Sequence, residues 1–405
     1  MLVEPKYLCE RRRSLIGPAV VEEAGQITIE PFHLSMIQMP EAVSAPANRL
    51  RVGYVGGGFL AQKVHLPNLV SLADECELVA IAEVRPRLGR LIQERYDIPS
   101  LYPDHLSLAA AEDVDAIFVS GHFSGQGDIA RDLLLAGKSV FVEKPVALSV
   151  EQLDELVAAE RSGGGRLMVG YMKRYDRGNR KARDLVRLRT ADLGEITYVR
   201  AHGFGGDWVA ASSEREPLTT EESYPAVTAR FPRWLPAWLE TPYLAYAQQW
   251  THNLNLVRFL LDSTEPVRVR TVDLTCTEGS WDVRGIVSLE VAGARTVIEA
   301  GTIASDGWHE HTQVFFRSGW IKTTAPPLLL DGASADVEVF DGREGLLTYP
   351  CAAGPATWAY REEARAFLQA LRTDAEFESS LQDAAVDVAA FEEIFRLYVA
   401  QEARG

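Results

Sequence analysis

Two short segments carry residue types that can do chemistry. Residues 51–61 read Arg-Val-Gly-Tyr-Val-Gly-Gly-Gly-Phe-Leu-Ala, and residues 143–145 read Glu-Lys-Pro. The first pattern is typical of a buried strand that runs into a glycine turn and a helix, which together hold a dinucleotide pyrophosphate. The second places a lysine and a carboxylate at the end of a later strand, on the edge where such sheets bind ligands. The first segment predicts a cofactor, and the second predicts where the chemistry takes place.

The glycine turn meets the pattern G-x-G-x-x-G/A with Gly56, Gly58 and Ala61. The first glycine allows a tight turn, the second lets the backbone approach the pyrophosphate, and the third position is small so that helix and strand pack closely. Free amides at the helix N-terminus then receive the phosphates. By itself the pattern leaves open a glycine-rich turn that binds nothing.

An acidic residue in the right place supports the cofactor interpretation. Glu83 ends the apolar run at 76–83 and follows Ala61 by 22 residues (83 − 61). A carboxylate there accepts hydrogen bonds from the adenosine ribose and repels a 2′-phosphate, so NAD is favoured over NADP. Arg85 and Arg87 follow closely and weaken that preference, so NADP stays possible.

Helix-like and strand-like segments alternate around these motifs. We expect strands at 76–83, 115–120, 139–143 and 166–171, and helices to about 73, to 96, at 126–136 and at 149–160. Such alternation predicts a parallel sheet with right-handed crossovers. After residue 195, strand-like segments dominate until the last 45 residues, which return to helix. The predicted fold class is α/β: an N-terminal extension (1–48), a Rossmann dinucleotide-binding domain (49–172) and an α+β domain (173–405) with a mostly antiparallel or mixed sheet.

Composition narrows the class of protein. The net charge of −16 argues against nucleic acid or an anionic membrane as a partner. Four scattered cysteines without a CxxC pair predict reduced thiols in the cytoplasm. In the first 48 residues, Arg11–Arg13 is faintly similar to an export signal, but Glu22 and Glu23 interrupt any apolar core. We expect this segment to be an arm that packs on a neighbouring surface or subunit.

The chain resembles the glucose–fructose oxidoreductase / inositol dehydrogenase / MocA (Gfo/Idh/MocA) family. The matching segments follow one another in family order over residues 50–395: 52–67, 136–145, 169–175, 193–196, 252–261, 360–371 and 380–391. The resemblance implies an open second sheet whose flat face packs in dimers or tetramers. It also implies a substrate bound between that sheet and the nicotinamide.

The resemblance assigns roles to individual residues. Lys144 is expected to bind the reacting oxygen, with Glu143 orienting it, and His252 is expected to be the general base. Gln248 stands where family dehydrogenases usually carry an aspartate that relays protons, and an amide cannot exchange a proton. Asn255 replaces another frequent aspartate. The proton path is therefore expected to differ from that of the family.

Further residues complete the predicted site. The expected cofactor contacts are Gly56, Gly58, Phe59, Leu60, Glu83, Arg85, Ser120, His122, Glu143 and Lys144, and the expected substrate contacts are Gln248, Tyr171, Arg174, Trp234 and Asn255. Between 204 and 250, aromatic residues and prolines predict an irregular loop that covers the site, the aromatic rings serving either a sugar ring or a subunit interface. His309 and His311 are two residues apart in a predicted strand, so their side chains lie on the same face. We interpret this as a solvated face of the strand and not as a metal site.

Together these features predict an NAD(P)-dependent oxidoreductase that acts on a ring hydroxyl or ketone of a sugar, aminosugar or cyclitol. Two alternatives stay open. Some family members are glycosidases or lyases that oxidise the sugar transiently with tightly held NAD. A non-catalytic ligand-binding scaffold is the other.

Overall fold

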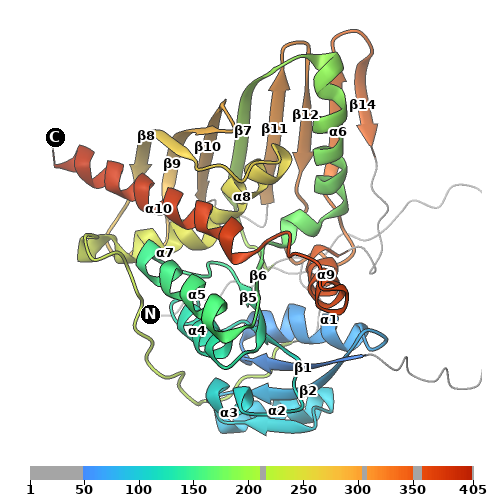
Figure 1. Ribbon diagram of the computed structural model, residues 1–405. Helices are drawn as coiled ribbons and strands as arrows, with labels where there is room; N and C mark the ends of the chain where they lie inside the picture. Colours follow the sequence, from blue (N-terminus) through green and yellow to red (C-terminus); the bar gives the residue numbers. More distant parts are fainter. Residues whose placement is uncertain (1–48, 210–215, 303–307, 350–357, 404–405) are drawn as a thin grey trace, which may run out of the picture. The chain divides into compact units, whose positions relative to one another are not determined.

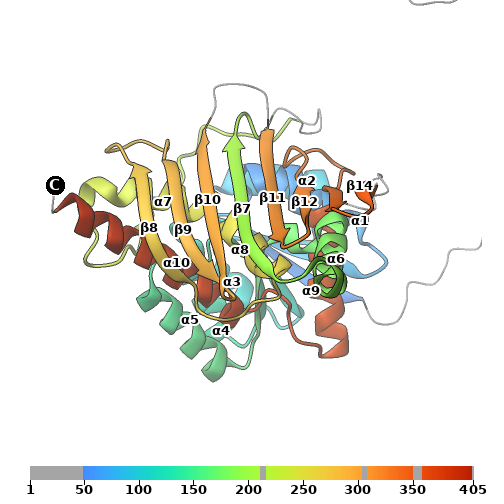
Figure 2. The same cartoon turned by 90° about the horizontal axis from the view of Figure 1, so that it is seen from above.

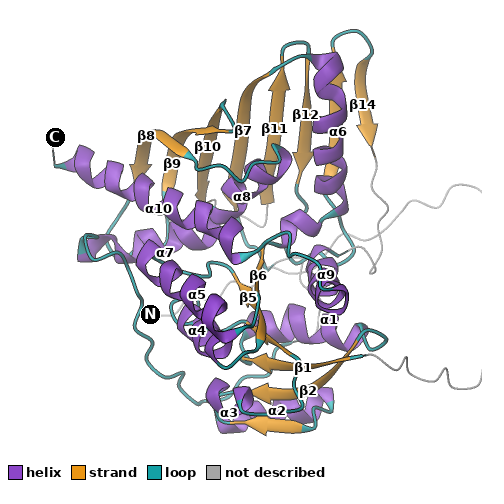
Figure 3. Cartoon of the chain, in the orientation of Figure 1, coloured by secondary structure: helices purple, strands orange, loops and turns teal. Residues whose placement is uncertain are grey.

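The computed structural model describes residues 49–209, 216–302, 308–349 and 358–403. They form two sheets with helices packed around them (Figure 3). The predicted arm at 1–48 lies outside the described residues. Within the described ranges, no helix is both long and apolar enough to span a membrane.

The first sheet, sheet A, has six strands in the order β3-β2-β1-β4-β5-β6, all paired in parallel. This is the strand order of a Rossmann fold, and it confirms the predicted parallel sheet. The strands are β1 (Leu50–Val55), β2 (Cys76–Ala82), β3 (Ser100–Tyr102), β4 (Ala116–Val119), β5 (Ser139–Glu143) and β6 (Leu167–Gly170). Three residues are too few to show a pattern, so β3 had no signal in the sequence.

Helices connect the strands of sheet A and cover its faces. They are α1 (Leu66–Ser71), α2 (Pro86–Tyr96), α3 (His105–Ala109), α4 (Gln126–Leu135) and α5 (Val150–Gly163), and a π-helical turn, η1 (Ala61–His65), precedes α1. Because both faces are covered, strands such as β4 are buried along their whole length and read as continuous apolar runs.

The second sheet, sheet B, has eight strands in the order β14-β13-β12-β11-β7-β10-β9-β8. Of the described pairs only β7 and β10 run in parallel, which confirms a mostly antiparallel sheet. One face packs against α6 (Arg177–Leu193), α8 (Thr251–Leu260) and α10 (Leu381–Glu402) (Figure 2). The strands are β7 (Ile196–Gly205), β8 (Arg268–Thr275), β9 (Arg284–Val291), β10 (Ala294–Thr302), β11 (Trp308–Phe316), β12 (Gly319–Thr324), β13 (Asp336–Asp341) and β14 (Gly345–Tyr349).

The connection from β7 to α8 is only partly irregular, which corrects the expectation of a loop up to residue 250. Residues 216–236 contain no helix or strand, but η3 (Ala237–Leu239) and α7 (Glu240–Gln249) follow. Pro236 immediately precedes η3 and Pro242 lies in the first turn of α7, where a missing N–H removes no helical hydrogen bond. These two prolines therefore mark helix starts.

The C-terminal part of the chain packs on sheet A as well as on sheet B. In α9 (Ala359–Thr373), Phe367 makes edge-on ring contacts with Phe118 of β4 and Phe141 of β5. Ser380 forms a backbone bridge with Met168 of β6. The boundary at residue 172 stays a prediction, because residues from both sides of it share the same hydrophobic cores.

Candidate active site

The glycine turn after β1 is shaped to admit a bound group. Gly56 has a φ of +99°, and a Cβ there would lie 2.6 Å from the carbonyl oxygen of Ser120, so only glycine fits. Gly58 is different, because beyond its own atoms and its two chain neighbours no described atom lies within 4 Å of the place where its Cβ would stand. The space in front of Gly58 fits the close approach of a pyrophosphate.

Glu83 lies where the ribose-binding carboxylate was expected. It is buried at the end of β2, and its Oε2 accepts a hydrogen bond from the Gly57 amide at 2.6 Å. Arg85 donates to the same carboxylate from Nε at 2.8 Å and from Nη2 at 3.0 Å. These contacts hold the carboxylate beside the glycine turn.

The predicted cofactor residues all lie along one edge of sheet A. Gly56, Gly58, Phe59 and Leu60 follow β1, Glu83 and Arg85 follow β2, Ser120 and His122 follow β4, and Glu143 and Lys144 end or follow β5. This is the carboxyl edge, where parallel sheets bind ligands. The Ser120 hydroxyl is hydrogen-bonded to the Tyr54 hydroxyl of β1 at 2.5 Å, so this side chain links the end of β4 to β1.

Lys144 extends from this edge toward α7. Its Nζ donates a hydrogen bond to the backbone carbonyl oxygen of Gln248 at 2.9 Å. Burial lowers the pKa of Lys144 to about 8, with Glu143 opposing the shift and Lys173 adding to it. The ammonium can therefore lose or regain its proton near neutral pH.

Behind Lys144, three buried groups form a cluster. The carboxylate of Glu143 accepts from the Lys144 amide at 3.2 Å and contacts Nε2 of His65 at 2.8 Å. Glu363 of α9 completes the cluster, with ligand atoms of all three side chains within 4.8 Å of one another. Burial, and then the charge of Glu143, raise the pKa of Glu363 well above its ordinary value. Glu363 therefore keeps its proton to a higher pH than an exposed glutamate does.

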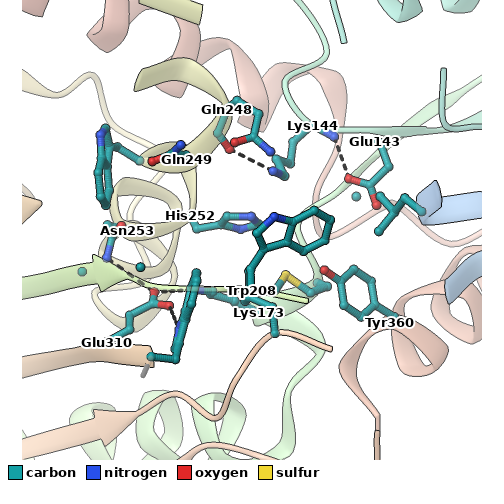
Figure 4. A pocket seen from close by; sticks show the side chains of 18 of the residues that line it. Glu143, Lys144, Lys173, Trp208, Gln248, Gln249, His252, Asn253, Glu310 and Tyr360 are labelled. Carbon is teal, nitrogen blue, oxygen red and sulfur yellow. Dashed lines mark hydrogen bonds and ion pairs between the residues drawn. The ribbon is translucent and has the colours of Figure 1, made fainter. Parts of the chain in front are cut away.

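His252 lies in the first turn of α8 and faces the same space as Lys144. Figure 4 shows its imidazole between Gln248 and Lys144 on one side and Lys173 and Glu310 on the other. Burial, then the charges of Lys144 and Lys173, hold the pKa of His252 well below 6.5. The imidazole is neutral at pH 7, and within the described residues its Nδ1 has no hydrogen-bond partner.

A buried ion pair in this space was not foreseen. Lys173, in the short helix η2 (Met172–Tyr175), pairs with Glu310 of β11. Trp308 donates to Glu310 at 3.0 Å and Asn253 at 3.4 Å. The sequence contained a signal for this pair. Side chains alternate along a strand, so Glu310 points inward while its neighbours His309 and His311 point to the other face. His309 is exposed there, and His311 stacks on His202.

One cavity of about 170 Å³ lies between the edge of sheet A and sheet B, and it is lined by Glu143, Lys144, Lys173, His252 and Glu310. Typical pockets for drug-sized ligands are larger, about 300–1,000 Å³, so this cavity suits one small ring. Its walls combine aromatic rings, amides and the charged groups described above (Figure 4). The further lining residues include Leu60, Met172, Trp208, Gln249, Trp250 and Tyr360.

Four predicted substrate residues lie outside this cavity. Arg174 donates to Asn255 at 2.6 Å and pairs with Asp383 at 2.7 Å, and Asn255 donates to Asp387 at 2.7 Å. The Tyr171 hydroxyl accepts from Thr251, and Trp234 donates to Glu392. These side chains bind other parts of the protein and are not in the proposed site. Gln248 does line the cavity.

Comparison with known proteins agrees with this geometry. Residues 50–171 match the GFO_IDH_MocA family model, described as an oxidoreductase family with an NAD-binding Rossmann fold. Inositol 2-dehydrogenase 3 of Saccharopolyspora erythraea is 26% identical over 282 residues, which cover 68% of this chain and 74% of the relative. Inositol 2-dehydrogenase of Burkholderia lata is 27% identical over 339 residues, covering 80% and 87%.

A solved structure shares the fold over most of the chain. KijD10, a 3-ketoreductase from Actinomadura kijaniata in complex with NADP and TDP-benzene, superposes with a TM-score of 0.66. The superposition covers 86% of this chain and 98% of the other at 18% sequence identity. At that identity the likeness concerns the fold alone.

Proposed function

Because the chain belongs to the Gfo/Idh/MocA family of NAD-binding oxidoreductases, we propose that it interconverts a ring hydroxyl and a ketone on a sugar, aminosugar or cyclitol. The observation that carries this proposal is the cavity at the edge of sheet A into which Lys144 and His252 both face. The two sequence relatives named above are inositol 2-dehydrogenases, which agrees with a small polyol as substrate.

Lys144 is the group that we assign to the proton on the reacting oxygen. A bound nicotinamide dinucleotide would supply the hydride acceptor or donor. With a pKa of about 8, Lys144 can take the hydroxyl proton as an amine or give it back as an ammonium. The carbonyl oxygen of Gln248 holds Nζ in place.

His252 has a different role in this proposal. Its imidazole stays neutral because burial, and then the positive charges of Lys144 and Lys173, hold the pKa of His252 well below 6.5. It therefore orients a substrate hydroxyl by hydrogen bonding. The side-chain amide of Gln248 binds hydroxyls but exchanges no proton, so it does not replace the family aspartate.

The cavity walls suit a polyhydroxylated ring. Trp208, Trp250, Trp308 and Tyr360 offer aromatic faces that pack on C–H faces of a ring. The amides of Gln248, Gln249 and Asn253 offer both donors and acceptors to hydroxyl groups. The combination matches a ligand that has apolar faces and a polar rim.

The test is a screen of sugars, aminosugars and cyclitols with NAD and NADP, which follows the absorbance of the reduced nicotinamide. Lys144→Ala should lower kcat/KM by about 10²–10⁴-fold, and His252→Ala should also lower it. Lys181→Ala and His309→Ala, which change exposed residues of the same types, serve as controls. Full activity in both site variants would refute the assignment. Net reduction of NAD separates a dehydrogenase from a glycosidase, which returns the cofactor unchanged.

We also propose that the protein acts in the cytoplasm and associates with copies of itself. Cys76 and Cys276 are free thiols, as is usual in a reducing compartment. The net charge of −16 disfavours nucleic acid as a partner.

A further inference from the structure

Residues 216–231, which lie between β7 and α7, cross the carboxyl edge of sheet A. We call this segment the strap (Figure 1). Near its start, the Leu218 amide donates to Gln62 Oε1 at 2.7 Å, and Gln62 Nε2 donates back to the Leu218 carbonyl at 3.0 Å. Gln62 lies in η1, just after the glycine turn. Near the other end, Arg230 pairs with Asp128 at 3.0 Å and also with Glu155. The strap is therefore tied down on both sides of the cofactor edge.

Inside the strap, Glu222 occupies the N-terminus of α2. Pro86, the first residue of α2, has no N–H, so Arg87 and Leu88 carry the first free amides. The Arg87 amide donates to both carboxylate oxygens of Glu222, at 3.0 and 3.1 Å, and the Leu88 amide donates at 3.0 Å. The Thr220 hydroxyl donates at 3.0 Å. These donors form a typical anion-binding set, and a carboxylate of the chain itself fills it.

This anion position adjoins the place of the adenosine ribose. Glu83, which marks that place, binds Arg85 through two guanidinium nitrogens. The Arg85 guanidinium also lies 5.3 Å from the centroid of the Tyr224 ring, two residues beyond Glu222. Arg85 is thus engaged by Glu83, and the α2 amides are engaged by Glu222. A 2′-phosphate at the ribose would meet two carboxylates that already hold the nearby donors.

We propose that Glu222 is a cofactor-selectivity residue, which fills the anion position that the 2′-phosphate of NADP needs and so favours NAD. Glu222 contacts neither the substrate cavity nor Lys144. The preference for NAD over NADP, which the sequence assigned to Glu83 alone, is therefore shared between the carboxylates of Glu83 and Glu222. The inference rests on the nicotinamide cofactor of the proposed function and is independent of which substrate is used.

The experiment measures binding of NADH and NADPH by fluorescence titration in the absence of any sugar or cyclitol. Wild type is compared with Glu222→Ala, Glu222→Gln and Glu221→Ala, the last removing an exposed carboxylate from the next residue of the strap. Glu222→Ala should shift the ratio of the two dissociation constants toward NADPH by about tenfold or more, because a like charge is removed and donors are freed. Glu222→Gln should give a smaller shift, and Glu221→Ala should leave the ratio unchanged.

Two results would overturn the proposal: an unchanged ratio in a Glu222→Ala variant that melts like wild type, or tighter binding of NADPH than NADH by wild type. An equal loss of both nucleotides in Glu222→Ala would also overturn it, because the strap would then support binding without selecting. Failure of the proposed function looks different, since it leaves a protein that binds NADH but turns over no polyol.

Discussion

At the scale of single residues, the same burial acts on Lys144 and His252 with different results. Both pKa values are lowered, but Lys144 still titrates near neutral pH, whereas His252 stays neutral. Two protonated groups facing one small cavity would repel each other, so the site holds one exchangeable positive charge near pH 7. That charge resides on Lys144, next to Glu143.

The pH dependence of turnover follows from this assignment. Oxidation of an alcohol needs the neutral amine, so its rate should rise as the pH rises through about 8. Reduction of a ketone needs the ammonium, so its rate should fall over the same range. Initial rates in both directions between pH 6 and 10 give the profile, and Lys144→Arg should remove the transition. A wild-type profile that is flat from pH 7 to 9 would contradict the role of Lys144.

Glu363 allows a prediction about stability. In the folded protein the Glu363 carboxyl group keeps its proton above pH 4.5, whereas in the unfolded chain the same group is ionised. Unfolding therefore releases a proton, and the free energy of unfolding falls as the pH rises. The slope from this group is about 1.4 kcal/mol per pH unit wherever only the folded state holds the proton. Glu363→Gln should remove this slope and so lose less stability between pH 5 and 8 than wild type does, as measured by urea unfolding. Equal losses in the two proteins would show that Glu363 is ionised when folded.

Local signals explain which site residues the sequence could predict. Glu83 and Lys144 each follow a buried strand of a parallel sheet, so their shared edge follows from chain order alone. Lys173 and Glu310 are 137 residues apart, and they meet because η2 and β11 line the same cavity. We expected Arg174 and Asn255 to bind substrate, but in the structure they bind Asp383 and Asp387 of α10. No local sequence pattern indicates these long-range contacts.

At the scale of elements, the glycine turn after β1 contains two glycines, Gly56 and Gly58, that are needed for different reasons. Gly56 provides a backbone conformation and a close contact that any side chain would disturb. Gly58 has an ordinary φ and open space in front of it, so it keeps room for a ligand. The turn therefore contains one glycine for the fold and one for the cofactor.

A pair of substitutions tests this division. Gly56→Ala should destabilise the protein by about 1–3 kcal/mol or more, since it adds positive-φ strain to a clash with Ser120. Gly58→Ala should leave the melting temperature nearly unchanged but weaken NADH binding, because the methyl group enters the space for the pyrophosphate. Thermal melting and NADH titration of both variants give the comparison. Loss of stability in Gly58→Ala, or tight NADH binding by it, would contradict the assignment.

Burial on both faces also decided which elements the sequence could predict. Strands β4 and β5 are short, apolar and bounded by helices, so they were located to within a residue at each end. In contrast, β12, β13 and β14 have mixed faces and were not located individually. The prolines predict a loop where the structure has α7, because proline signals a break unless it falls in a first helical turn.

At the scale of the whole molecule, sheet B has two unlike faces. Val287, Leu289 and Val339 point toward the helices and are buried. On the other face of the same strands, Ile286 is 46% exposed and Phe340 is 37% exposed. Phe340 stacks on Trp320 at 5.9 Å, and Tyr198 and Phe315 lie close together on the same face. Partly exposed aromatic side chains gathered on one face are typical of a protein interface.

We expect this face to bind a second copy of the chain. Light scattering after size exclusion should therefore give wild type a mass of at least two chains of 44.7 kDa. Phe340→Asp should shift the protein toward the mass of one chain, since a charge placed at a desolvated contact has no partner. Leu188→Asp is the matched control, because Leu188 is 70% exposed on α6 and lies away from this face. A wild-type protein that runs as a single chain at micromolar concentration would contradict the interface. A Leu188→Asp variant that dissociates as Phe340→Asp does would place the contact elsewhere.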